Sequence, residues 1–182
     1  EAPVRARAAF ALASVQDPAA GTALAGLLGD GDAAVRRDAA FALGQLGDAG
    51  PSGALLDALR RESAPEVRAR LLEALGKVGN ETALEGLMAL TLPPEEDGAR
   101  NLAVSRMGIR GITLPTAVQH LVGALKTGEI GAQVQAAYYF GRGPDPRPWA
   151  GQAGALVGQA VRRNARHPAF DDRLQAAAKD DL

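Results

Sequence analysis

The sequence has no cysteine among its 182 residues. Disulfide bonds, thiolate zinc sites and cysteine nucleophiles are therefore excluded. Aromatic residues make up only 4% of the chain, and there are two histidines, His120 and His167. Neither histidine has a His or Cys neighbour at the spacing of a metal-binding motif, so we expect no metal site and interpret His120 as an ordinary helix residue.

A strong excess of charge of one sign is also missing. Twenty Lys and Arg residues face 21 Asp and Glu residues, and the formal net charge is −1. Binding a nucleic-acid backbone usually requires a concentrated positive field, so we expect no nucleic-acid partner. Lys77, Lys126 and Lys179 are the only lysines, and this bias towards arginine, with abundant Ala and Gly, is typical of a GC-rich bacterial genome.

Long apolar runs are absent as well. No run reaches the ~18 residues that cross a bilayer, so we expect no membrane insertion. The compartment stays open between the cytoplasm and, if a leader was trimmed, the periplasm. The oligomeric state also stays open.

Residue groups that carry chemistry are few. The segment 141–144 contains proline and has no flanking strand, so it is not a phosphate-binding loop. Serine and threonine residues have no nearby histidine that would activate them. The acidic run 95–97 lies in a proline-rich turn, where we interpret it as capping the next helix. We therefore expect no catalytic residue and no cofactor in these 182 residues.

The dominant feature that is present is a repeat. Val4, Val35 and Val67 lie 31 and then 32 residues apart, and apolar residues follow each valine at offsets 4, 7, 8 and 11. These offsets form the apolar stripe of an amphipathic helix. The stripe residues of the three copies are Val4, Ala8, Ala11, Leu12 and Val15; Val35, Ala39, Ala42, Leu43 and Leu46; and Val67, Leu71, Ala74, Leu75 and Val78.

Each stripe is followed by a breaker, a second helix and a polar turn. In the turn 62–65, Ser63 and Glu66 have capping-box spacing, and Pro65 suits the first turn of a helix. Small residues such as Gly44 recur beside the stripe, which predicts close approach between neighbouring helices.

Weaker copies begin at Ala99 and Ala132, with second helices expected at about 115–126 and 150–163. The sequence thus predicts an all-α fold, a right-handed α-solenoid of about five helical hairpins in a single domain over residues 1–182. The expected repeats span approximately 2–30, 31–62, 63–93, 94–127 and 128–165, with a partial copy at 166–182. The abrupt end of that last copy suggests a longer parent protein.

The copy from Val35 to Asp48 reads Val-Arg-x-x-Ala-Ala-x-Ala-Leu-Gly-x-Leu-Gly-Asp. This pattern resembles the HEAT-repeat family in its short bacterial, lyase-type form. The copies at Val4 and Val67 match closely, and those at Ala99 and Ala132 match loosely. The resemblance implies an armadillo-like solenoid that serves as a scaffold, an adaptor or a lyase subunit. Iron-binding hydroxylases of this kind use paired His-Glu motifs, which this sequence lacks.

The resemblance also implies a ladder of arginines along the array, formed by Arg5, Arg36, Arg68 and Arg100. Each is expected to meet an acidic or amide group near a turn, such as Asp17, Asp48 or Asn80. The ladder is either a row that binds anions or a set of bonds that interlocks the repeats, since charge-assisted bonds to helix ends are a usual role of arginine.

Two groups of residues are candidate binding sites. The segment 138–149 holds both tyrosines and the only tryptophan, and aromatic and arginine side chains are enriched in binding hot spots. A rim of Tyr138, Arg142, Arg147 and Trp149 would bind a partner. The alternative is that Tyr139 and Phe140 lie at core offsets 7 and 8 and that Trp149 fills the loop. Phe10 and Phe41 share offset 6 with Tyr138, which indicates either an aromatic ridge for a partner or packing between repeats.

Together these observations predict a non-catalytic scaffold for protein–protein interaction, with a protein or peptide as its partner. The alternative is an accessory region of a larger bacterial enzyme, for example one fused to a cyclophilin-type prolyl isomerase or a lyase. A nucleic-acid binder, like the HEAT-like alkylpurine glycosylases, is disfavoured by the near-neutral charge.

Overall fold

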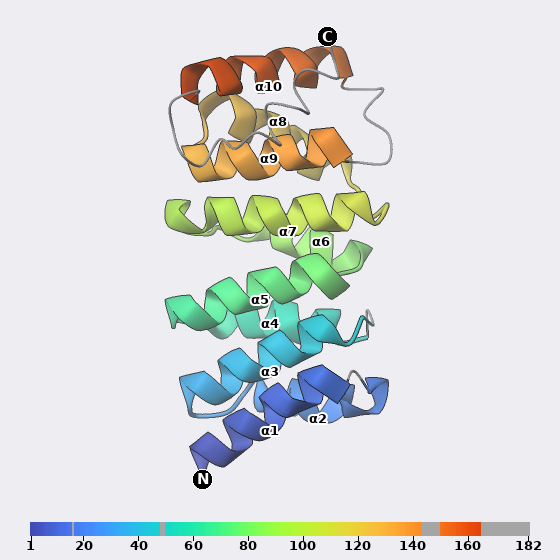
Figure 1. Ribbon diagram of the computed structural model, residues 1–182, viewed down its shortest axis with the longest axis vertical. Helices are drawn as coiled ribbons and strands as arrows, with labels where there is room; N and C mark the ends of the chain where they lie inside the picture. The colour runs from blue at the N-terminus through green and yellow to red at the C-terminus, as the bar shows by residue number, and fades with distance from the viewer. Residues whose placement is uncertain (16, 48–49, 143–149, 165–182) are drawn as a thin grey trace. The chain divides into compact units, whose positions relative to one another are not determined.

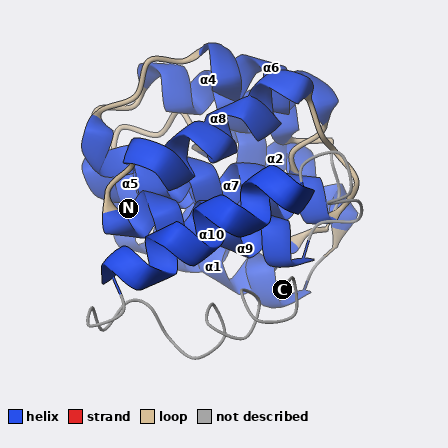
Figure 2. Ribbon diagram, turned by 90° about the horizontal axis from the view of Figure 1, so that it is seen from above, coloured by secondary structure: helices blue, strands red, loops and turns tan. Residues whose placement is uncertain are grey.

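The computed structural model in Figure 1 describes residues 1–15, 17–47, 50–142 and 150–164. Over these residues the regular structure is helical, with no strand (Figure 2). The chain divides into two compact units, Glu1–Leu90 and Thr91–Leu182. The predicted fold class, an all-α solenoid architecture of repeated helical hairpins, is confirmed.

The first unit contains two sets of helices. Its elements are α1 (Ala2–Val15), the short 3-10 helix η1 (Pro18–Ala20), α2 (Gly21–Leu27), α3 (Ala33–Gln45), α4 (Ser52–Arg61), α5 (Pro65–Val78) and α6 (Glu81–Ala89). The first helices of the repeats, α1, α3 and α5, lie side by side (Figure 1). Of the second helices, α2 packs against α3, while α4 packs against α5 and α6.

The second unit continues the same alternation. It contains the 3-10 helix η2 (Pro94–Glu96), α7 (Asp97–Ile109), α8 (Pro115–Thr127), α9 (Ile130–Arg142) and α10 (Ala150–Asn164). The helix α9 packs against both α7 and α8, and α10 contacts α8 and α9. The two second helices predicted for this part of the chain agree with α8 and α10 to within a residue at each end.

The predicted apolar stripe is buried in two of its three close copies. All five stripe residues of α3 and all five of α5 are buried. In α1, however, Val4 is 64% exposed and Val15 is 66% exposed, and the helix buries Ala6, Ala9 and Ala13 instead. The difference has a packing cause, because α2 packs on α3 and α4 on α5, whereas no described helix takes the equivalent place beside α1.

The close approach predicted from the small residues is confirmed at Gly44. A Cβ atom built there would lie 3.0 Å from the Cα atom of Ala74 and 3.1 Å from its Cβ. Such a contact is tighter than most Cβ atoms make, so Ala74 would have to shift by a few tenths of an ångström. Glycine at this position therefore permits the packing of α3 against α5.

The start of α5 differs from the expected capping box. Its N-cap is Ala64, which has no capping side chain, while Pro65 occupies the first turn as predicted. Glu62 instead binds the turn before the helix, since its Oε1 accepts the backbone N–H of Ser63 and of Ala64, each at 2.9 Å. The capping-box prediction was wrong because the N-cap lies one residue later than Ser63, and Glu62 already accepts the N–H of Ser63.

Candidate functional site

The arginine ladder binds acidic residues in the polar turns of the first unit. Arg5 donates to Asp30 through Nε at 2.7 Å and through a terminal nitrogen at 2.9 Å. Arg36 donates to Glu62 in the same way, at 2.7 and 3.0 Å. Each arginine thus reaches from a first helix to the turn that precedes the next first helix.

Two arginines of the ladder, Arg36 and Arg68, also bind backbone carbonyls. Arg36 donates to the carbonyls of Asp30 and Gly31 at 2.8 and 3.2 Å. Arg68 donates to the carbonyls of Leu59 and Glu62 at 3.0 and 2.9 Å. Because these guanidinium groups join the end of one repeat to the start of the next, the geometry supports the interlocking interpretation of the ladder.

Acidic groups near turns do meet the ladder, but two of the three partners named for it, Asp17 and Asn80, were wrong. Asp17 accepts the backbone N–H of Ala19 at 2.9 Å, and Asn80 accepts that of Ala83 at 2.9 Å. Both side chains therefore cap the helix that follows them. The arginines bind Asp30 and Glu62, which lie in the longer polar turns. Asp48 lies outside the described residues. In the second unit Arg100 pairs with Asp97 of its own helix.

The ladder keeps its carboxyl groups ionised. Hydrogen bonds from Arg5 hold the pKa of Asp30 at about 2, and those from Arg36 hold the pKa of Glu62 at about 2. The pKa of each of these two arginines is raised in turn by the same bonds. The four groups therefore form two charge-assisted links.

The predicted partnership of Phe10 and Phe41 is present as a stack. Their rings lie parallel, with centroids 5.4 Å apart and an interplanar angle of 11°. The guanidinium carbon of Arg70 lies 5.2 Å from the centroid of Phe41, and Nζ of Lys77 lies 5.8 Å from it. Both distances are within the range of cation–π attraction. We call these four residues, with Glu73, the aromatic–cation column.

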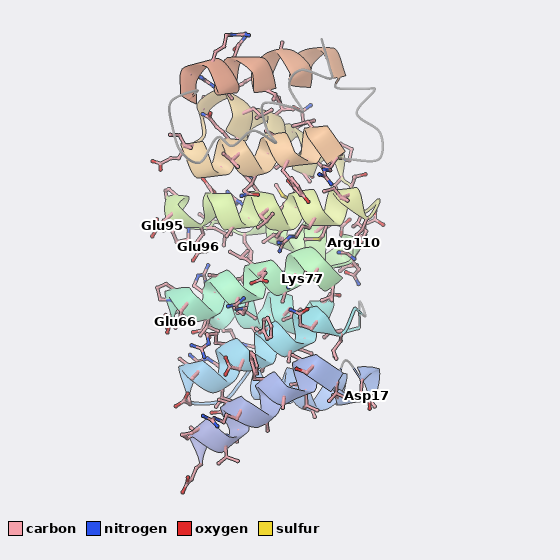
Figure 3. The ribbon with its side chains drawn as sticks, in the orientation of Figure 1. Asp17, Glu66, Lys77, Glu95, Glu96 and Arg110 are labelled. Carbon is pink, nitrogen blue, oxygen red and sulfur yellow. The ribbon has the colours of Figure 1, made fainter. Side chains whose placement is uncertain are left out.

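Glu73 holds the two cations of the column in place. Its carboxylate pairs with Arg70, and its other oxygen pairs with Nζ of Lys77 at 2.9 Å. Partial burial acts to raise the pKa of Glu73, but the bond from Lys77 and the charges of both cations hold it below its ordinary value. Figure 3 labels Lys77 on α5, at one end of this column. At the other end, on α1, Phe10 is 53% exposed.

The structure describes half of the predicted aromatic rim. Tyr138 is 39% exposed on α9, and Arg142 is exposed one turn later on the same helix. Arg147 and Trp149 lie outside the described residues. Tyr139 and Phe140 are buried, with their rings edge to face at 5.0 Å, so the core interpretation holds for this neighbouring pair.

A further site, which the sequence analysis missed, is a pocket of about 440 Å³ in the second unit. It lies among the start of η2, the start of α7, the second half of α8 and the start of α9. Its lining consists of Pro94, Asp97, Asn101, His120, Gly123, Ala124, Thr127, Gly128, Glu129 and Ala132. The only sequence signal is the spacing of His120, Gly123 and Thr127, which places them on one face of a helix.

A hydrogen-bond chain fixes the polar wall of this pocket. The fully buried Asn101 donates through Nδ2 to the carbonyl of Ala132 at 3.1 Å. Its Oδ1 therefore faces Nε2 of His120, 2.8 Å away, and Nε2 is the donor of that bond. Burial and then the positive charge of Arg100 lower the pKa of His120, against a smaller opposing effect of Asp97. The imidazole is thus held neutral near pH 7.

Two features of other protein classes are absent from the part of the chain that the structure describes. In that part, no group of three or more His, Cys, Asp or Glu side chains is arranged to hold a metal ion. No helix there is both long enough and apolar enough to cross a membrane.

Comparison with known proteins identifies the repeats. The family model for HEAT repeats matches residues 1–52 and 52–138. Two engineered proteins solved by the Northeast Structural Genomics Consortium are similar in structure over 100% of this chain. One has a TM-score of 0.64 at 21% identity and is covered over 92% of its own chain. The other has a TM-score of 0.57 at 20% identity and is covered over 90%.

A third structure, human deoxyhypusine hydroxylase in complex with glycerol, aligns with a TM-score of only 0.42 at 19% identity, over 100% of this chain and 79% of that chain. That score does not establish a shared arrangement. Curated proteins gave no significant sequence match.

Proposed function

The chain belongs to the HEAT-repeat family, and from that premise we propose that it is a non-catalytic scaffold that binds a protein or peptide. Stacked helical repeats present extended surfaces, and such arrays commonly serve as interaction scaffolds. The observation that carries the proposal is the aromatic–cation column on α1, α3 and α5. Its exposed end at Phe10 is where we place the contact with the partner.

The column has the properties of a binding hot spot. Phe10 is held by its stack on Phe41, so little side-chain freedom is lost when a partner covers its exposed surface. Aromatic rings and arginines are the side chains that most often dominate binding energy. A ring presented in this way favours an aromatic or aliphatic side chain of the partner.

The charges of the column add a second requirement. Arg70 and Lys77 carry two positive charges and Glu73 carries one negative charge, which leaves the column with a net charge of +1. An acidic residue close to the apolar anchor of the partner would complement this charge. We therefore propose a partner segment in which an aromatic or aliphatic residue is flanked by Asp or Glu.

Tyr138 and Arg142 are a second candidate contact surface, on α9 of the other unit. Their exposure supports this assignment, and the proposal for them is independent of the column. We assign no catalytic role to either surface. The alternative of an accessory region in a larger enzyme has no specific observation in its favour.

Selection from a displayed random peptide library tests this function. We expect peptides with an apolar anchor and neighbouring acidic residues to be enriched on the immobilised chain. Their affinity should fall by about tenfold or more in Phe10→Ala, because a central aromatic anchor is lost. Circular dichroism would check that the variant is folded.

Val15→Ala is the matched control. Val15 is more exposed than Phe10 and lies on the same helix, but it is outside the column. The selected peptides should bind this variant with unchanged affinity. Peptides that bind Phe10→Ala as tightly as the wild type would overturn the assignment of the column.

A further inference from the structure

The side chains that line the pocket in the second unit offer mainly hydrogen-bond acceptors. Because Nε2 of His120 donates to Asn101, only Nδ1 remains on the imidazole, and it is an acceptor. Thr127 donates its hydroxyl hydrogen to the carbonyl of Gly123 at 3.3 Å, which leaves the oxygen lone pairs. Both polar groups of Asn101 are already engaged. A ligand that binds these side chains must therefore supply the hydrogens.

The charged side chains that line the pocket are acidic. Asp97 and Glu129 both line the pocket, and no Lys or Arg is among its described lining residues. The charge of Asp97 is shared with Arg100. Glu129 forms no ion pair with any residue that the structure describes, and it adds a second negative charge to the lining. The pocket thus favours a cation that donates hydrogen bonds.

A glycine in the wall keeps the pocket open. Gly123 lies in the interior of α8, where glycine costs about 1 kcal/mol relative to alanine. A Cβ atom built on it would meet nothing within 4 Å, so packing gives no reason for the missing side chain. The residue instead removes bulk from the pocket side of the helix. Pro94, Ala124 and Ala132 add apolar surface to the lining.

We propose that this pocket binds the primary alkylammonium group of a small aliphatic amine or of a lysine side chain. Its volume of about 440 Å³ is within the range of small-ligand sites, roughly 300–1,000 Å³. The ammonium group donates to Glu129 and the neighbouring acceptors, and its methylene chain lies against the apolar part of the lining. The site is separate from the aromatic–cation column and does not depend on the function proposed for it.

Titration with butylammonium, followed by amide chemical shifts of the intact chain, tests the pocket. We expect saturable shifts that are centred on the lining residues. The matched uncharged probe is n-butanol, which should produce no comparable saturation. A second titration uses N-acetyl-lysine amide, which represents a lysine side chain, whereas butylammonium represents a small aliphatic amine. The probe that binds more tightly indicates which of these two ligands the pocket accommodates.

Two variants locate the binding. Glu129→Gln should raise the dissociation constant by roughly fivefold, because one exposed charge–charge contact is lost. Gly123→Leu should abolish saturable binding, because its side chain occupies the pocket. Gly26→Leu is the control for this bulk, since Gly26 lies in α2 of the other unit with equally open space around it. It should bind both amines normally.

Three results would overturn the proposal. The first is the absence of saturable shifts with either amine. The second is equal binding of n-butanol, which would exclude recognition of charge. The third is wild-type affinity in a folded Gly123→Leu variant, which would place the binding elsewhere.

Discussion

Arg36 and Glu62 are joined by two hydrogen bonds of 2.7 and 3.0 Å across 26 residues of sequence. Arg36 belongs to α3, and Glu62 lies in the turn before α5. Their side chains are only 19% and 6% exposed, so the pair is shielded from solvent on both sides. Glu62 also accepts two backbone N–H groups at the start of α5, which makes this one carboxylate a junction between consecutive repeats.

Removal of Arg36 should therefore be costly. We expect Arg36→Ala to lower the free energy of unfolding by about 2–3 kcal/mol, because Glu62 would remain shielded without its charged partner. Urea denaturation followed by circular dichroism measures the change. Arg60→Ala is the control, since Arg60 forms an exposed pair with Asp57 and should cost only about 0.5 kcal/mol. Equal losses in the two variants would contradict a special role for Arg36.

The ladder also predicts the stability of the chain in acid. Glu62 has a pKa of about 2 in the folded chain, below its ordinary value of 4.5, so folding favours its charged form. Its contribution is complete above about 4.5 and is lost as the pH falls from there towards about 2. Glu62→Gln should therefore show a shallower loss of unfolding free energy than the wild type over that interval.

Urea denaturation at a series of pH values measures this slope. Glu66→Gln serves as the control, because Glu66 is exposed and forms no ion pair with the described residues. It should keep the wild-type dependence on pH, to which Asp30 still contributes through its own lowered pKa of about 2. A Glu62→Gln variant that follows the wild-type curve would show that Arg36 does not hold this carboxylate ionised.

The fold could be predicted from the sequence where a helix has neighbours on both sides. In α3 the spacing of Val35 and Leu43 alone identifies a buried stripe, because it matches the period of the helix. The same spacing in α1 predicted burial of Val4 and Val15, which are exposed. The spacing of apolar residues predicts which face of a helix is apolar, but burial also requires another helix to cover that face.

The candidate site was predictable only in part for a similar reason. Phe10 and Phe41 share one offset in the repeat, and identical positions on adjacent helices meet. Arg70 and Lys77 hold other offsets, and they reach Phe41 because long side chains extend along a helix surface. The pocket around His120 depends on three helices at once, so neither the spacing along one helix nor the composition could reveal it.

The stack of Phe10 on Phe41 should contribute measurably to stability as well as to binding. We expect a double-mutant cycle of Phe10→Ala and Phe41→Ala to give a coupling energy of about 1 kcal/mol, because parallel rings at this separation attract beyond their buried area. Urea denaturation of the four proteins measures it. A cycle of Val15→Ala with Phe41→Ala should be additive, and a coupling near zero for the phenylalanines would mean that the stack stabilises little.

Glycine to alanine substitutions at Gly44 and Gly123 should change stability in opposite directions. Both residues lie inside helices, where alanine is favoured over glycine by about 1 kcal/mol. At Gly123 the new methyl group meets nothing within 4 Å, so we expect the full gain.

At Gly44 the methyl group would lie 3.0 Å from the Cα atom of Ala74, and relief of that contact requires α3 and α5 to separate. We expect a net loss of about 1–2 kcal/mol there, since overpacking costs more than the helix preference returns. Thermal and urea denaturation of both variants measure the two signs. A stabilised Gly44→Ala variant would mean that the two helices separate easily, and the close contact would then not be what requires glycine at this position.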